Sequence, residues 1–217
     1  MLAILFNVCL ISSNLFACKL TCLFGRFTIS GADVIFPISY ILNDCLAEVY
    51  GYRKARFVIW TGFAMNLFVV LTACIVNLLP AAPLWDGDAA FQYVFGAAPR
   101  STIASLLAFL AGSTLNAFVL SKMKTESKGK HFALRAAVSS LAGETLDSLI
   151  FVPIVFWSMG WKVIVMTMVC EIVVKVGYEI LVLPLTGLVV KRLKKYEGTD
   201  TYDEGISYNP FKINDLY

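Results

Sequence analysis

Six apolar runs, each long enough to cross a bilayer as a helix, take up most of this chain. A membrane-spanning helix needs about 20 apolar residues, and an open sheet cannot cross lipid because its edges would stay unpaired. The runs cover residues 2–24, 30–50, 56–79, 101–121, 134–157 and 162–190. The sequence therefore predicts an all-α integral membrane protein. Residues 1–195 form a six-transmembrane-helix bundle in this prediction, and residues 196–217 form a polar cytoplasmic tail.

The composition supports lipid as the solvent. Of the 217 residues, 59% are apolar and 15% are charged, whereas soluble domains average about 45–50% and about 25%. The net charge of +3 is small and unevenly placed, which argues against a nucleic-acid partner. These values also exclude a disordered chain and a secreted disulfide scaffold.

Basic residues are concentrated in alternate connections, a pattern typical of the cytoplasmic side. The second-to-third connection, the fourth-to-fifth connection and the tail carry Arg53, Lys54, Arg56, Lys122, Lys124, Lys128, Lys130, Arg135, Lys191, Arg192, Lys194, Lys195 and Lys212. The other connections carry only Arg26, Arg100 and Lys162. Both termini are therefore predicted to be cytoplasmic.

Two segments outside the runs have their own expectations. Residues 80–100 mix aromatic side chains with Asp86 and Asp88, which is typical of an interfacial helix with aromatic anchors; a lid over an external vestibule is the alternative. The polar, tyrosine-rich tail is expected to be poorly ordered.

Charged side chains inside a span are costly and usually mark function. On the second run, Asp44 and Glu48 are four residues apart, so they share one helical face, with Tyr40 a turn earlier. On the fifth run, Glu144 and Asp147 are three apart and also share a face. These two runs each present a pair of carboxylates to one side.

The sixth run carries Glu171, Lys175 and Glu179 as a stripe at four-residue intervals, and Asn14 and Asn116 add polar groups from the first and fourth runs. At about 1.5 Å per residue, the mid-span groups lie roughly 9 to 24 Å from the cytoplasmic basic residues; they are Asn14, Asp44, Asn116, Asp147 and Lys175. We expect a bundle whose interior holds a polar pocket. The alternative is helix-to-helix adhesion by polar side chains, with Lys175 paired to an acid on its own helix.

Several classes of protein are excluded by the residues that are absent. The single histidine, His131, lies in a basic connection, so a Ser-His-Asp or Cys-His enzyme is not expected. There is no Walker A pattern and no CxxC, and we expect neither a metal nor a cofactor. A transporter, a substrate-binding membrane subunit or a carboxylate enzyme acting on lipid headgroups remain. The pocket suits a small polar ligand with several N–H donors, on which Phe36 and Tyr40 can stack.

Five motifs together resemble the vitamin uptake transporter family, which includes queuosine-precursor transporters. They are FPISYILNDCLAEVYG (36–51) followed by RKAR (53–56), Ser12-Ser13-Asn14, ASLLAFLAGSTLN (104–116), GETLDSLIF (143–151) and the E-x3-K of residues 171–175. The resemblance covers nearly the whole chain and implies a six-helix importer of a 7-deazaguanine (preQ0, preQ1 or queuine) across the bacterial cytoplasmic membrane, for tRNA modification.

The resemblance implies pocket roles for Asn14, Asp44, Asn116, Asp147 and Lys175, and Glu144 is a further candidate. A guanine-like edge presents N1–H and an exocyclic amine that one carboxylate, Asp147 or Asp44, accepts together, while Lys175 donates to O6. The network acids Glu48, Glu171 and Glu179 are candidates for proton coupling. Facilitated, proton-driven or partner-driven transport, another heterocycle or vitamin as substrate, and a homodimer all stay open.

Overall fold

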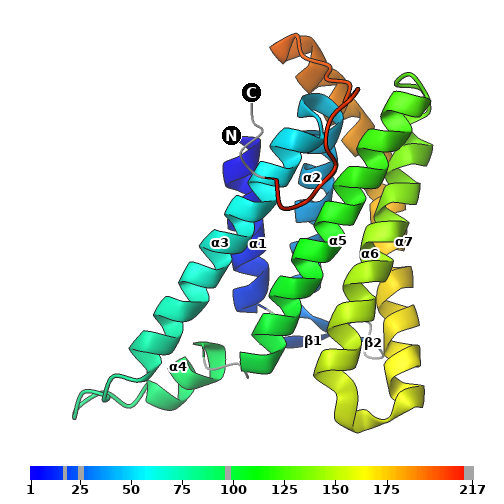
Figure 1. The fold of residues 1–217 in the computed structure, drawn as a ribbon. Helices are drawn as coiled ribbons and strands as arrows, with labels where there is room; N and C mark the ends of the chain where they lie inside the picture. The colour runs from blue at the N-terminus through cyan, green and yellow to red at the C-terminus, as the bar shows by residue number, and fades with distance from the viewer. Residues whose placement is uncertain (17–18, 24–26, 96–98, 213–217) are drawn as a thin grey trace.

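The computed structural model describes residues 1–16, 19–23, 27–95 and 99–212. Its helices are α1 (Leu2–Phe16), α2 (Phe36–Tyr50), α3 (Tyr52–Asn77), α4 (Asp88–Phe95), α5 (Pro99–Glu126), α6 (Phe132–Phe156) and α7 (Trp161–Glu197). The long helices lie side by side as a bundle (Figure 1). Helix α7 is continuous from Trp161 to Glu197, with Pro184 inside it.

In the part of the chain that the structure describes, four helices are long and apolar enough to cross a membrane, namely α3, α5 over Ile103–Glu126, α6 and α7. The chain is thus a multi-pass membrane protein with a helical fold. Helices α1 and α2 have 15 residues each, which gives about 22 Å of helix against a hydrocarbon core of about 30 Å. The count of six spans therefore stays a prediction.

The prediction that the first apolar run is helical to residue 24 is wrong. Helix α1 ends at Phe16, and the chain then forms an antiparallel hairpin of β1 (Leu20–Leu23) and β2 (Phe27–Ser30). Apolar, aromatic and β-branched residues on both sides of a glycine favour such a hairpin over continued helix. The predicted boundaries at 24 and Arg26 lie outside the described residues.

The second run begins its helix later than predicted. Residues 31–34 form a 3-10 turn, η1 (Gly31–Val34), and α2 starts at Phe36, with Pro37 in its first turn. Proline fits there because the first helical N–H groups have no partner within the helix. At the other end Gly51 adopts a φ of +84°, which lets the chain turn directly into α3.

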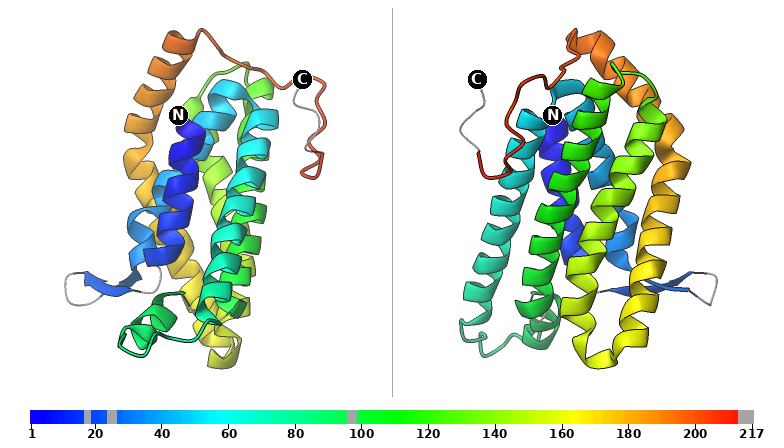
Figure 2. Two further views of the ribbon diagram at one scale, coloured as in Figure 1. Left: turned by 90° about the vertical axis from the view of Figure 1, so that its left-hand side faces the viewer. Right: turned by 45° about the vertical axis from the view of Figure 1, so that its right-hand side comes forward.

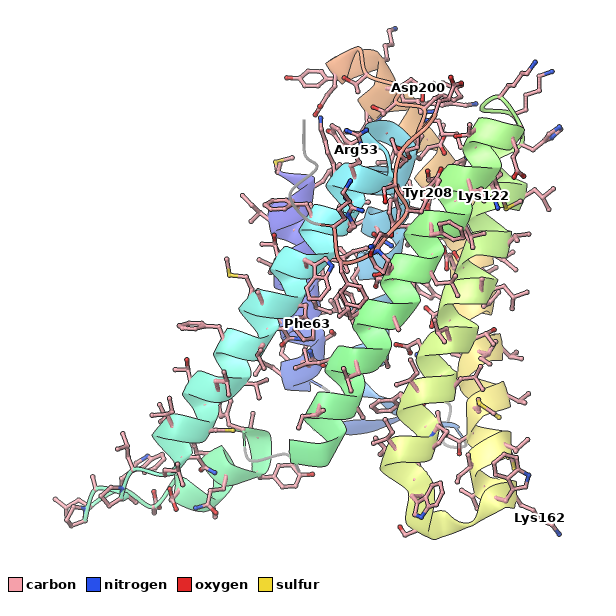
Figure 3. All side chains as sticks on the ribbon, in the orientation of Figure 1. Arg53, Phe63, Lys122, Lys162, Asp200 and Tyr208 are labelled. Atoms are coloured by element: carbon pink, nitrogen blue, oxygen red, sulfur yellow. The ribbon has the colours of Figure 1, made fainter. Side chains whose placement is uncertain are left out.

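The N-terminus and residues 198–212 of the tail lie toward the end of the bundle that also holds the α2–α3 and α5–α6 connections (Figures 1 and 2). Arg53 and Lys122 lie at this end and Lys162 at the opposite end (Figure 3). The cytoplasmic assignment requires the strongly basic connections to lie together at one end of the bundle, and this placement agrees with that requirement. The assignment of this end to the cytoplasm stays a prediction.

Residues 88–95 of the long connection form the short helix α4, which lies beside α3 at the opposite end from the termini (Figure 1). No residue of α4 is buried, and the rings of Phe91 and Phe95 lie 4.6 Å apart between centroids. An exposed aromatic helix of this kind is typical of an interfacial segment.

The expectation of a poorly ordered tail is wrong for residues 198–212, which pack against the ends of α3 and α5 (Figure 1). The Asp203 carboxylate accepts hydrogen bonds from the Tyr52 backbone N–H, at 2.7 Å, and from the Ser121 hydroxyl. Arg56 donates to the Asn209 carbonyl at 2.5 Å. The tail docks because it supplies acceptors to a helix N-terminus and to a buried arginine that would otherwise lack them.

Glu48 binds three basic side chains at this end, and we call these residues with Asp200 the Glu48 cluster. The Glu48 carboxylate is 1% exposed and lies 2.5 Å from Arg135 Nη1, 2.7 Å from Lys194 Nζ and 4.0 Å from Lys124 Nζ. Asp200 bridges the two lysines at 2.5 and 2.8 Å. Partial burial raises the pKa of Asp200, but hydrogen bonds from both lysines outweigh it and hold that pKa below its usual value. Asp200 is therefore ionised and bound at neutral pH.

Glu48→Gln is expected to lower the free energy of unfolding by about 3 kcal/mol, because it leaves the buried Arg135 and the half-buried Lys194 without their carboxylate. Denaturant titration of the purified protein in detergent measures this loss. Glu126→Gln, on the exposed last turn of α5, is the matched control and should change stability by less than about 0.5 kcal/mol. Equal stability of both variants would contradict the role given to Glu48.

Candidate functional site

Four residues of α2 at four-residue intervals form one stripe along the helix: Phe36, Tyr40, Asp44 and Glu48. Tyr40, Asp44 and Glu48 are fully buried, and Phe36 is half-buried. We call this set the α2 stripe. Each of its members contacts a different group of side chains on α5, α6 and α7.

At the Phe36 end, Lys175 of α7 lies among three carboxylates, and we call Lys175, Glu144, Asp147 and Glu171 the Lys175 group. Its Nζ lies 2.8 Å from Asp147 Oδ2, 3.4 Å from Glu144 Oε2 and 3.7 Å from Glu171 Oε2. The same nitrogen lies 5.1 Å from the centre of the Phe36 ring, within the range of a cation–π contact. The structure thus brings together predicted site residues from α2, α6 and α7.

Tyr40 lies where α5 and α6 approach most closely. A Cβ atom on Gly112 would come within 2.8 Å of the Tyr40 hydroxyl, 2.9 Å of the Gly143 carbonyl and 3.0 Å of the Asp147 Cβ. Glycine is therefore required at this crossing, where small residues allow two membrane helices to touch. The Phe36 and Tyr40 rings lie 5.4 Å apart at 54°, so an aromatic wall stands beside the Lys175 group.

One turn further along the stripe is a second polar group, which we call the Asp44 group: Asp44, Asn116, Ser140 and Glu179. Asn116 Nδ2 donates to Asp44 Oδ1 at 2.8 Å, and the Ser140 hydroxyl donates to Glu179 Oε1. The carboxyl groups of Asp44 and Glu179 are in hydrogen-bonding contact with each other. Because Glu179 follows Lys175 by one helical turn, the two groups are neighbours.

Two predicted site residues lie elsewhere. Asn14 accepts a hydrogen bond from Ser105 of α5 at 3.1 Å, and within the described part of the chain no hydrogen bond or ion pair joins it to the Lys175 group. Glu48 belongs to the cluster at the end of the bundle. The structure therefore separates the predicted residues into two adjacent groups and two outliers.

The sequence did not indicate that three basic residues contact the buried Glu48 carboxylate. Lys124, Arg135 and Lys194 served only as markers of the cytoplasmic side, yet Lys124 and Arg135 are fully buried and all three contact Glu48. The available signal was Glu48 itself, since a buried carboxylate needs a cation or several donors.

The Lys175 group offers both acceptors and a donor next to flat rings. Three carboxylates face one ammonium, so the group can bind N–H donors or a cation as well as a carbonyl oxygen. Glu144 Oε2 is buried and makes no hydrogen bond with any described residue. The chemistry therefore fits a planar heterocycle that has neighbouring N–H groups and a carbonyl.

Lys175→Met is expected to destabilise the protein by about 2–3 kcal/mol, because Glu144 and Asp147 then stay buried without a cation. Adding Asp147→Asn should restore part of that loss, so a double-mutant cycle in denaturant should show a favourable interaction between the two residues. Lys162→Met, on an exposed side chain at the start of α7, is the control. Simple additivity of the two site substitutions would contradict the Lys175–Asp147 pair.

Comparison with known proteins supports the transport class. Residues 30–189 match a protein family described as "Putative vitamin uptake transporter". With four apolar helices around buried polar groups, this match defines a membrane transporter. The chain belongs to the vitamin uptake transporter family.

A relative from Bacillus subtilis (strain 168) bears the name "Probable queuosine precursor transporter" and is 29% identical over 147 residues. The alignment covers 67% of this chain and 64% of the relative, so this chain spans less than two thirds of the relative's length. No solved structure matches the chain.

Proposed function

We propose that this protein imports a queuosine precursor, a 7-deazaguanine such as preQ0, preQ1 or queuine, across a bacterial cytoplasmic membrane. The observation that carries the proposal is the Lys175 group, in which acceptors, one donor and an aromatic wall converge inside the bundle. The family and the name of the Bacillus subtilis relative support it. In this proposal α1 and α2 complete six spans, and both termini are cytoplasmic.

In the proposed complex, the heterocycle lies against Phe36 and Tyr40. Asp147 and Glu144 accept the N1–H and the exocyclic amine, and Lys175 donates to the O6 carbonyl. The ligand takes the place of contacts that Lys175 makes with Asp147 and Glu144. These three charged side chains therefore keep partners when the ligand binds. Asp44, Asn116 and Asn14 stay candidates for the remaining edge of the ring.

Asp147→Asn should reduce uptake of labelled preQ1 at least tenfold, since an amide cannot accept two N–H groups as a carboxylate does. Cells that lack their own uptake route, supplied with preQ1, preQ0 or queuine, provide the assay. Asp88→Asn, on the exposed helix α4, is the carboxylate-to-amide control and should transport normally. Normal uptake by Asp147→Asn would reject this binding mode; wild-type failure with all three compounds would reject the substrate class.

Glu171→Gln should discriminate between two precursors by their charge. PreQ1 carries an aminomethyl group that is cationic at neutral pH, whereas the nitrile of preQ0 is neutral. Removing one carboxylate from the Lys175 group should weaken preQ1 binding about fivefold, or roughly 1 kcal/mol, and leave preQ0 binding unchanged. Equilibrium binding to purified protein measures both. Equal effects on the two ligands would show that Glu171 does not contact the aminomethyl group.

A further inference from the structure

The buried carboxylates of the bundle differ in whether they face a cation. Glu48, Glu144 and Asp147 each lie within 4.0 Å of a lysine or arginine nitrogen. Asp44 and Glu179 are 1% and 4% exposed. No such ion pair reaches either of them within the ranges that the structure describes. The two acids without a cation are also the two that contact each other.

Contact between two carboxyl groups requires a proton. An ionised carboxylate only accepts hydrogen bonds, so two of them cannot bond to each other, and their charges repel in a buried site. When one carboxyl keeps its proton, its O–H donates to the other. The Asp44–Glu179 contact therefore describes a pair that shares one proton.

The polar neighbours of this pair suit both protonation states. An amide and a hydroxyl each offer a donor and an acceptor, so Asn116 and Ser140 can donate to a carboxylate or accept from a carboxylic acid. Asn116 is completely buried and donates to Asp44 while its own Oδ1 has no partner among the described residues. That unpaired acceptor beside Asp44 can accept the carboxyl O–H whenever it is not donated to the partner acid.

The charged and titratable groups around the pair come from every helix that packs there. The groups that interact with the pair are Tyr40, Cys45 and Glu48 of α2 and Glu144 of α6. The basic residues on the neighbouring helices include Arg56 of α3, Lys124 of α5, Arg135 of α6, and Lys175 and Lys194 of α7. Each basic residue among them is engaged elsewhere: Arg56 with tail carbonyls, Lys175 within its own group, and the others with Glu48. None of these cations makes an ion pair with Asp44 or Glu179, so none of them replaces the proton.

We propose that Asp44 and Glu179 form a proton-binding site that couples import to the entry of one proton. The inference rests on the proposed import function and adds its energy source. Asp44 follows Tyr40 by one turn and Glu179 follows Lys175 by one turn, so the site borders the substrate group on two helices. A proton entering from outside forms the carboxyl O–H; its release to the cytoplasm breaks that bond and leaves two carboxylates, which Asn116 and Ser140 can hydrogen-bond.

Liposomes containing the purified protein, with the membrane potential clamped at zero, test the coupling. An outside-acid gradient of one pH unit should drive accumulation of labelled preQ1 by about tenfold at a stoichiometry of one proton per substrate. Glu179→Gln should abolish this accumulation, yet still exchange labelled for unlabelled preQ1 across the membrane. Asp44→Asn should abolish the accumulation as well. Glu126→Gln, a matched change at an exposed carboxylate, should accumulate preQ1 like the wild type.

Two results would overturn the coupling: preQ1 transport by the wild type without accumulation under the gradient, or full accumulation by both amide variants. If one variant fails to insert, as judged by size-exclusion chromatography, the other variant carries the test.

Infrared spectroscopy separates failure of this inference from failure of the import function. The wild type should show a protonated-carboxyl band at neutral pH that disappears in both amide variants and persists in Glu126→Gln. The carboxyl signal that the amide substitutions remove belongs to the pair and needs no substrate. Its absence from the wild type would overturn the proton site, whereas its presence in a protein that fails to transport preQ1 would overturn only the proposed import.

Discussion

The buried Glu48 carboxylate is the interaction on which the arrangement of the bundle depends. It joins α2 to α6 through Arg135 and to α7 through Lys194, and its backbone carbonyl accepts from Lys124 of α5 at 2.5 Å. Helix α2 is short, so its depth and rotation must be fixed by specific contacts rather than by a long apolar surface. Once Glu48 is fixed, the four-residue repeat directs Asp44, Tyr40 and Phe36 at the same three helices.

The sequence was most informative where a pattern is local. The four long runs, the shared face of Asp44 and Glu48 and the face of Glu144 and Asp147 follow from hydrophobicity and helical spacing alone. Pairing across helices was not predictable, because a uniformly apolar run does not reveal which side faces its neighbours. Lys175 could have paired within its own helix; it does contact Glu171, but its shortest contact is with Asp147 of α6.

The two errors in the fold have physical causes of the same kind. The hairpin after α1 is apolar and so was indistinguishable by hydropathy from a continuing helix; its β-branched residues and glycine carried the signal. The tail looked disordered because it is polar. Its acidic groups and carbonyls, however, accept hydrogen bonds from Tyr52, Arg56 and Lys124 at the end of the bundle. These donors would otherwise be unpaired.

Along the α2 stripe the chemistry changes with each turn, and the order matters. Phe36 and Tyr40 present rings, Asp44 meets an acid and an amide, and Glu48 meets fixed cations. Arg135, Lys194 and Lys124 hold the Glu48 carboxylate, so Glu48 joins the helices to one another. A carboxyl whose neighbours both donate and accept can gain or lose a proton without leaving a group unpaired. Asp44, which lies next to the Lys175 group, is therefore the position on α2 where the neighbouring side chains tolerate a change of charge.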